Sequence, residues 1–423
     1  MPWRPGWVRF VVGLEARCVV RLEEVTAYAA FSSRAFRYQL IAVTLSSFSQ
    51  QMLATVVGWD LYLSTHSPVV LGNVGLVQII PVLLFTFAAG HVADRYNRSR
   101  TALVTQVGQA LVGFGLAAAG SGRGVVLIYA CLFLTATARA FQWPAQSAML
   151  PQTVPPEHLT QAISWSGSAR EMATVGGPAL AGALIAAFGS ESVYIVQAVC
   201  CVLSAICFGL MRVPDRAEHE RPEIGLKAVA EGVRFVWREK LILSALSLDL
   251  LAVFFGGATA LLPIYAADIL RIGATGLGWL RAAPAIGAGL TAVWIAHRPA
   301  FRNAGVVLLA TVAAFGVATI GFAVSTSAWL SFWMLFLTGA FDSVSVVLRI
   351  SLVQSRTPDA LRGRVSAVNG LFIAASNQWG AVESGVAAAL MGTVPSVVFG
   401  GSATIVMVAA VAVLSTSMRR WKN

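Results

Sequence analysis

The sequence predicts an all-α membrane protein in which twelve transmembrane helices form two six-helix bundles related by a pseudo-two-fold axis. Three observations predict it: the composition, the spacing of the apolar runs and an internal repeat. Of the 423 residues, 57% are hydrophobic and only 12% are charged, and the mean hydropathy is +0.74. Soluble domains carry about 25% charged residues. Lipid tails can solvate the apolar outer faces of helices and water cannot, so this composition fits a bilayer.

The net charge of +11 raises the question of a nucleic-acid partner, but the distribution of the charges argues against one. Lys and Arg fall in short clusters between apolar runs, as they do in membrane loops. We therefore expect a lipid bilayer as the surrounding partner and no nucleic acid. The five cysteines lack metal-ligand spacing, which indicates small buried residues and no metal site.

Apolar runs long enough to cross a bilayer recur along the chain. A hydrocarbon core of about 30 Å requires roughly 20 residues per helix. Twelve runs meet this length. They predict transmembrane helices at 38–64, 69–92, 101–120, 124–149, 160–188, 191–211, 241–267, 275–296, 304–324, 328–353, 365–391 and 395–417.

Polar segments between these runs divide the chain into two halves. With the N-terminus in the cytoplasm, 24 of the 30 Lys and Arg lie in cytoplasmic segments and three lie in outer loops, which predicts a multi-pass protein of the plasma membrane with both termini inside. Amphipathic surface helices are expected from Val8 to Val25 and from Gly225 to Trp237. The predicted parts are a cytoplasmic N-terminal extension (1–37), a six-helix bundle (38–211), a cytoplasmic linker (212–240), a second six-helix bundle (241–418) and a cytoplasmic tail (419–423).

The two halves resemble each other at a shift of 203 residues. Chance similarity between two apolar stretches is the alternative, but it explains matches in loops poorly. Two parallel six-helix repeats share an axis along the membrane normal, so a substrate site is expected between them near the midplane. The matched pairs include Pro155 with Pro358, Gly167 with Gly370, Gly177 with Gly380, and Gly182 with Gly385.

The loop after the second predicted helix reads Gly90-His91-Val92-Ala93-Asp94-Arg95-Tyr96-Asn97-Arg98-Ser99-Arg100. It resembles the G-x-x-x-D-R-x-x-R-x-R loop of the major facilitator superfamily. The resemblance implies that Asp94 meets the start of the eleventh helix, near Pro358 to Arg364, and locks the inside closed. A carboxylate there can accept charge-assisted hydrogen bonds and is favoured by a helix N-terminus. Arg98 and Arg100 would hold the loop, although positive-inside anchoring alone also explains the arginines.

The fifth predicted helix carries Gly177-Pro178-Ala179-Leu180-Ala181-Gly182, which resembles the G-P-x-x-x-G element of exporters in that superfamily. Gly177 and Gly182 permit close helix approach, and Pro178 removes a backbone donor and bends the helix. The alternative interpretation is that these residues serve ordinary helix packing. The second half departs from both patterns, because it has Gly380-Ala381 and lacks the acidic loop residue, which leaves the gating role with the first half.

Three further stretches resemble one branch of the superfamily, the enterobactin-exporter-like and macrolide-efflux-like proteins. They are Trp59 to Pro68, Trp143 to Pro151 and Thr357 to Val365. The resemblance implies the major facilitator fold and a small amphipathic substrate, such as a siderophore or a drug-like compound.

Ionisable side chains inside the predicted helices mark a candidate site, because each is unfavourable by about 2.5–3.5 kcal/mol on insertion scales. We interpret Glu171, Asp342 and Asp249, in that order, as candidates for proton coupling. Burial disfavours a charged carboxylate and a nearby arginine favours it, so a carboxylate held between these effects can bind and release a proton. The other residues predicted to line a central aqueous cavity are Arg139, Arg170, Arg349, Glu383, Gln51 and Gln142.

Arg139 and Asp342 occupy the same repeat position with opposite charge. We expect them to face each other across the pseudo-two-fold axis. The alternative is that the carboxylates form static ion pairs, Glu171 with Arg139 or Arg170, and Asp342 with Arg349.

The expected function is secondary active transport, as a proton-coupled, monomeric exporter that works by alternating access. The proton gradient would supply the energy and no cofactor is expected. An importer or facilitator of a small solute on the same fold is the alternative, and a non-transporting membrane sensor is a more remote one. An enzyme is not expected, because the sequence lacks H-E-x-x-H and G-x-S-x-G motifs and its five histidines are scattered.

Overall fold

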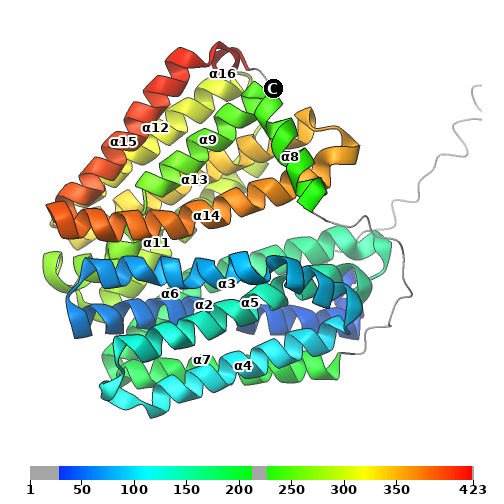
Figure 1. The fold of residues 1–423 in the computed structure, drawn as a ribbon, viewed down its shortest axis with the longest axis vertical. Helices are drawn as coiled ribbons and strands as arrows, with labels where there is room; N and C mark the ends of the chain where they lie inside the picture. Colours follow the sequence, from blue (N-terminus) through cyan, green and yellow to red (C-terminus); the bar gives the residue numbers. More distant parts are fainter. Residues whose placement is uncertain (1–27, 212–225, 422–423) are drawn as a thin grey trace, which may run out of the picture.

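The computed structural model describes residues 28–211 and 226–421, and the regular structure within these ranges is helical throughout. Figure 1 shows two bundles of long helices, the first below and the second above in that view. The surface helix expected at 8–25 lies outside the described residues. A helix is present where the other was expected, as α8 (Leu226–Arg238), and its place on the membrane surface stays a prediction.

The first bundle contains six long helices whose ends lie within four residues of the predicted spans. Local signals set several of these ends. Ser33 and Asn97 accept hydrogen bonds from amides three residues further on, and Gly189 ends α6 with a positive φ. The helices are α2 (Arg34–Thr65), α3 (Pro68–Arg95), α4 (Arg98–Ala118), α5 (Val125–Thr153), α6 (Leu159–Phe188) and α7 (Ser190–Leu210).

The second bundle repeats this order after α8. Eleven of the described helical segments are long and apolar enough to cross a membrane. A twelfth, α14, has 33 residues and runs beside α3 of the first bundle (Figure 1). The predicted all-α membrane fold is therefore confirmed. The helices are α9 (Lys240–Phe255), α11 (Gly273–Ala296), α12 (Ala304–Val324), α13 (Ala328–Arg356), α14 (Asp359–Met391) and α15 (Thr393–Leu414), followed by the short α16 (Thr416–Arg420).

The span predicted at 241–267 is present as an apolar segment at Lys240–Ile269, but its helix is interrupted. α9 ends at Phe255, and two glycines follow it. A Cβ on Gly257 would lie 2.8 Å from the Gly380 carbonyl oxygen, so a larger residue would push α14 away from the break. The chain continues as the 3₁₀ turn η4 (Ala258–Leu261), the short α10 (Leu262–Ile264) and the π-helical η5 (Tyr265–Ile269).

The hydrophobic core joins the two bundles on one side of the molecule only. A single cluster of buried side chains extends from Met52 of α2 to Leu277 of α11 and so spans both bundles. Away from this region each bundle has a core of its own, around Phe208 in the first and around Leu348 in the second. Because close packing holds helices together in a membrane, the bundles are joined tightly where this shared cluster packs and are separate on the other side.

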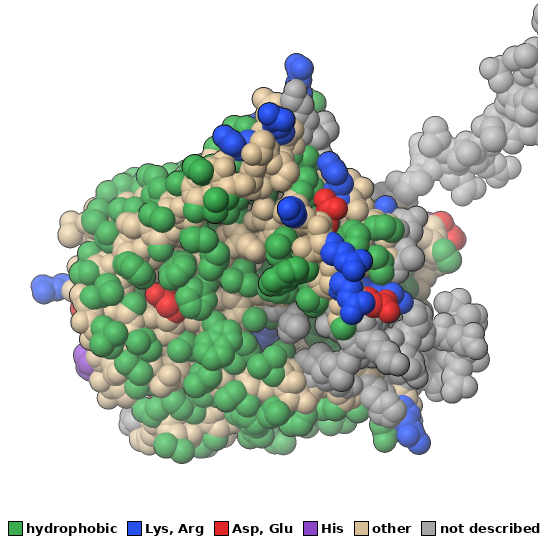
Figure 2. Space-filling model, turned by 45° about the horizontal axis from the view of Figure 1, so that its top comes forward, with side chains coloured by type: hydrophobic (Ala, Val, Ile, Leu, Met, Phe, Trp, Pro, Cys, Tyr) green, Lys and Arg blue, Asp and Glu red, His purple; other side chains and the backbone are tan. Residues whose placement is uncertain are grey.

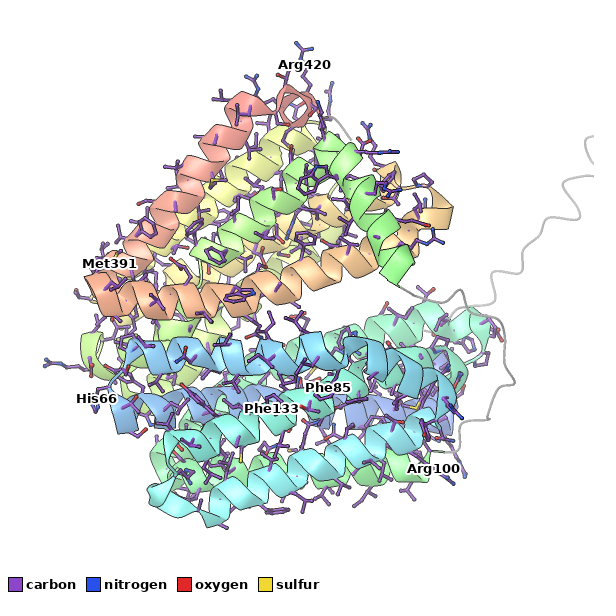
Figure 3. The ribbon with its side chains drawn as sticks, viewed as in Figure 1. His66, Phe85, Arg100, Phe133, Met391 and Arg420 are labelled. Carbon is purple, nitrogen blue, oxygen red and sulfur yellow. The ribbon has the colours of Figure 1, made fainter. Side chains whose placement is uncertain are left out.

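His66 and Met391 lie on the joined side, which we call the closed side, and Arg100 lies on the opposite side (Figure 3). We call that opposite side the linker side, because α8 and the end of α7 lie there (Figure 1). Figure 2 shows a hollow between the two bundles, with the blue of a Lys or Arg side chain visible inside it. The molecule is thus closed at one side and hollowed between the bundles.

Candidate functional site

Backbone contact at Gly182 and Gly278 closes one half of the seam between the bundles, where α6 packs on α11. A Cβ built on Gly182 would lie 2.5 Å from the Ala274 carbonyl oxygen and 3.0 Å from the Gly278 Cα. A Cβ on Gly278 would lie 2.5 Å from the carbonyl oxygen of Pro178, which sits inside α6. Small residues permit this close approach of helices in a membrane.

The other half of the seam is formed by α3 and α14 and repeats the same arrangement. A Cβ built on Gly385 would lie 2.7 Å from the Gly72 Cα. Gly182 and Gly385 are separated by the 203-residue shift of the internal repeat. The pseudo-two-fold relation read from the sequence therefore pairs α6–α11 with α14–α3 across the interface.

Gly177 and Gly380 are a second pair of residues related by the 203-residue shift, and each packs against a helix of its own bundle. A Cβ on Gly177 would lie 2.6 Å from the Gln51 Cβ of α2. A Cβ on Gly380 would lie 2.9 Å from the Phe254 carbonyl oxygen of α9. The close approach predicted for Gly177 is thus present, and the second half reproduces it without a proline.

Polar contacts reinforce the closed side. The Tyr62 hydroxyl of α2 donates a hydrogen bond to the Asp268 carboxylate of η5, and the Arg281 guanidinium of α11 donates one to the Ala54 carbonyl oxygen at 3.2 Å. Both contacts cross from one bundle to the other. These contacts could not be predicted from the sequence, because charged side chains near helix ends usually face water and no local motif marks them.

The predicted latch on the linker side is only partly within the described side chains, since that of Asp94 is not among them. The Arg98 guanidinium donates a hydrogen bond to the Ala148 carbonyl oxygen of α5 at 3.1 Å, which ties the loop to its own bundle. Arg95 and Arg100 are exposed, and a Cβ on Gly90 would meet no atom within 4 Å. The role of Asp94 stays a prediction.

In the first bundle Arg123 is paired with Asp60 at 3.0 Å and lies 3.6 Å from Glu191, whereas the charged residues predicted for the site form other contacts. Arg139 and Glu171 are exposed, and the Arg170 guanidinium lies over the Trp143 ring at 5.2 Å from its centroid. Among the described residues, no ion pair joins Glu171 to Arg139 or to Arg170, so the static pairing considered for this carboxylate is not seen. Nor does an ion pair join Arg139 to Asp342 in the described parts of the chain.

Gln142 does not line a cavity, which corrects the prediction for it. Its side chain is 2% exposed and donates a hydrogen bond to the Ser46 hydroxyl at 2.8 Å. Its carbonyl oxygen accepts one from Gln109 at 2.7 Å. The Gln142 side chain thus joins α2, α4 and α5. Gln51 is half-buried and donates to the Thr174 hydroxyl of α6 at 3.2 Å.

The second bundle contains a buried ionic group. Arg349 forms an ion pair with Asp249 of α9, and the side chains of these two residues are 7% and 9% exposed. The expected static pair with Asp342 is looser, at 3.9 Å from the guanidinium, and the Asp342 side chain is 47% exposed. Asp249 is therefore the residue held in a static pair. Glu383 is half-buried and accepts a long hydrogen bond, 3.4 Å, from Ser384.

A cavity of about 190 Å³ lies beside Asp342. Its walls come from the break after α9 and from α11, α12, α13 and α14. Irregular backbone at membrane depth is tolerated where it is buried in protein or lines a cavity, and this break does so. The molecule thus has two repeats, a seam closed on one side, and polar groups beside a cavity.

A family model described as Major Facilitator Superfamily matches residues 40–381. The chain belongs to the major facilitator superfamily. The resemblance inferred from the loop of 90–100 is thereby confirmed, and the chain is a multi-pass membrane transporter and not an enzyme. Members of the major facilitator superfamily act on small molecules within the membrane.

Curated relatives within the superfamily include exporters. The enterobactin exporter of Escherichia coli is 26% identical over 406 residues, which cover 92% of this chain and 94% of the relative. Macrolide efflux protein A of Streptococcus pyogenes is 26% identical over 217 residues, 48% of this chain and 52% of the relative. The chain therefore aligns with almost the whole of the first relative and with about half of the second.

A solved transporter structure supports the fold independently. The bacterial homologue of the human lysosomal transporter Spinster, in an inward-facing and occupied conformation, superimposes with a TM-score of 0.69 at 14% identity. The match covers 91% of this chain and 97% of that protein. At this identity the likeness concerns the fold alone.

Proposed function

We propose that this transporter is a proton-coupled exporter of a small amphipathic compound, siderophore-like or drug-like, which acts as a monomer in the plasma membrane by alternating access. The observation that carries the proposal is the one-sided closure of the molecule. One hydrophobic cluster spans both bundles at the closed side, and separate clusters serve each bundle toward the linker side. With the linker in the cytoplasm, this is the state that receives a substrate from inside the cell.

Two carboxylates support the proton coupling. Glu171 is exposed without an ion pair among the described residues, and Asp342 is half-exposed beside a cavity. A carboxylate that is accessible in one conformation and buried in another changes its proton affinity with the conformational state. Such a group can therefore carry a proton in one direction while the substrate moves in the other.

The names of the relatives support export and guide the choice of substrates. The enterobactin exporter and macrolide efflux protein A are both 26% identical to the chain. We therefore take a catecholate siderophore and erythromycin as the first two compounds to assay.

The test uses purified protein in proteoliposomes with an imposed pH gradient. Wild-type protein should move at least one of the two compounds against its concentration gradient, and a protonophore should abolish the movement. Glu171→Gln and Asp342→Asn should lose pH-driven transport while remaining folded by size-exclusion chromatography. Undiminished pH-driven transport in both variants would overturn the coupling, and net uptake into whole cells would favour the importer.

A further inference from the structure

The ionic group of the second bundle carries one positive and two negative side chains. Arg349 contacts Asp249 in an ion pair and Asp342 at 3.9 Å. Among the described residues no other ion pair involves either carboxylate, so the charge of one of them remains unbalanced. Asp342 is both the more distant and the more exposed of the two, at 47% against 9%. The unbalanced charge therefore belongs to Asp342.

Asp342 is the charged residue among those that line the adjoining cavity of about 190 Å³. Two hydroxyls that share this lining have their protons engaged elsewhere. The Thr319 hydroxyl donates to the Phe315 carbonyl oxygen at 2.9 Å, and the Thr338 hydroxyl donates to that of Leu335 at 2.6 Å. Since each hydroxyl has one proton, both oxygens are left with lone pairs to offer.

Asn377 adds a further acceptor from α14. Its amide nitrogen donates to the Ile373 carbonyl oxygen at 2.8 Å, and its carbonyl oxygen has no partner within the described part of the chain. The cavity thus combines one carboxylate with three acceptor oxygens, and these groups can bind a donor cation. The second N–H of the Asn377 amide and the Thr259 hydroxyl are donors that share the lining. An anion would meet no cationic side chain among the lining residues.

Aromatic and small residues form the rest of the wall. Phe315 and Phe322 of α12 line the cavity together with Gly256 and Gly257 at the break after α9. Aromatic faces attract organic cations, and the apolar surface suits the carbon skeleton that carries the charge. A smaller space of about 10 Å³ between Asp249 and Asp342 is lined by Phe315 as well, and it has room for about one water molecule.

We propose that this cavity is a subsite for a protonated amine, so that the transported compound is an amphipathic organic cation whose ammonium group binds against Asp342. The proposal rests on the proposed function in taking the ligand to be the transported compound. The ammonium group donates hydrogen bonds to the carboxylate and to the surrounding acceptors. A proton on Asp342 removes the negative charge, so the amine and the proton exclude each other at this residue.

The test is equilibrium binding to the purified full-length protein in lipid nanodiscs, followed by the fluorescence of dansylcadaverine, an amphipathic primary ammonium. The matched probe is its N-acetyl derivative, which keeps the fluorophore and lacks the charge. Wild-type protein should bind the amine at least about tenfold more tightly than the acetylated probe, and Asp342→Asn should remove this preference. Binding of the amine should weaken as the pH is lowered, because Asp342 then takes up a proton.

Three controls separate the possible outcomes. Glu157→Gln removes a carboxylate from an exposed turn of the first bundle and should leave both affinities unchanged. Thr338→Val, which removes one acceptor with little change in volume, should weaken the amine several-fold more than the acetylated probe. Displacement of the amine by sodium chloride but not by choline chloride at equal ionic strength would assign the site to an inorganic cation and overturn the proposal.

Equal binding of the two probes to the wild type, or an unchanged preference in Asp342→Asn, would also overturn it. Binding at equilibrium requires neither a gradient nor a direction of transport. Absence of pH-driven export with the charge preference intact would therefore count against the proposed function and leave the cation subsite standing.

Discussion

Gly182 of α6 packs directly against Gly278 of α11, so the backbones of the two bundles are in contact there without side chains between them. A Cβ on Gly182 would lie 3.0 Å from the Gly278 Cα, closer than ordinary van der Waals contact. Alternating access requires this seam to open while the linker side closes. The contact therefore sets the stability of the closed side relative to the opposite conformation.

Gly182→Val should shift the protein away from the state seen here, because the added side chain cannot fit at the seam. A reporter cysteine at Leu61, which is fully buried on the closed side, should then react with a membrane-impermeant maleimide about fivefold faster or more. The measurement uses a background in which the five native cysteines are replaced. Gly167→Val lies on the same helix in open space and should leave the rate unchanged. Equal rates in the two variants would show that the seam does not control opening.

Tyr62→Phe should weaken the closed side through loss of the hydrogen bond to Asp268. Hydrogen bonds to charged groups contribute about 1.5–3 kcal/mol, which corresponds to roughly a tenfold or larger rise in the population with the closed side open. Spin labels at the exposed Leu63 and Leu390, one on each bundle, should report longer distances by pulsed electron resonance.

Tyr129→Phe is the control for that experiment. The Tyr129 hydroxyl donates to the Val70 carbonyl oxygen, and both residues belong to the first bundle. Loss of this bond should leave the distance distribution between the bundles as in the wild type. A shift of the same size in both variants would mean that general loosening, and not the contact across the seam, moves the labels.

Arg349→Met should destabilise the folded protein strongly. Removing one partner of a buried ion pair leaves an uncompensated charge, at about 3–5 kcal/mol. The double variant Arg349→Met with Asp249→Asn should recover most of the loss in thermal unfolding midpoint, because neither residue is then charged. Arg356→Met, at an exposed position on the same helix, should have little effect. A double variant no more stable than Arg349→Met would contradict the pairing.

Gln142→Leu should lower stability and leave substrate affinity unchanged. The substitution removes hydrogen bonds to Ser46 and Gln109 within the core of the first bundle, with an expected loss of about 1–3 kcal/mol. The thermal unfolding midpoint should fall, while the KM for transport stays as in the wild type. Ser147→Ala, exposed on the same helix, should change neither quantity. A raised KM without loss of stability would restore the cavity role first predicted for Gln142.

The positions of the helices follow from local physics and could be predicted. Each apolar run must satisfy its backbone hydrogen bonds internally in lipid, so run length fixes where a helix lies. The exception at 241–267 arises because Gly256 and Gly257 are compatible with a helix or a break. Contact with Gly380 of α14, which is distant in sequence, accompanies the break in the folded chain.

The candidate site could be predicted only in part, because a polar residue on a helix has no local signal for what it faces. Gln142 and Arg139 of α5 were both predicted to line the cavity, yet the first is buried in a hydrogen-bond network and the second is exposed. From the sequence, Asp342 was the expected static partner of Arg349, and Asp249 had no assigned partner. Their separate roles depend on which of them meets Arg349 closely, and this is set by the packing of α9 on α13.

Composition and the spacing of apolar runs thus determined a polytopic membrane protein, and the 203-residue repeat with the loop of 90–100 determined its family. Only the tertiary structure decided which side is closed, which glycines meet, and which carboxylate remains unbalanced beside a cavity. The physical reason is the range of the interactions. Helix formation in lipid depends on neighbours along the chain, whereas closure and charge balance depend on contacts between helices that the sequence keeps far apart.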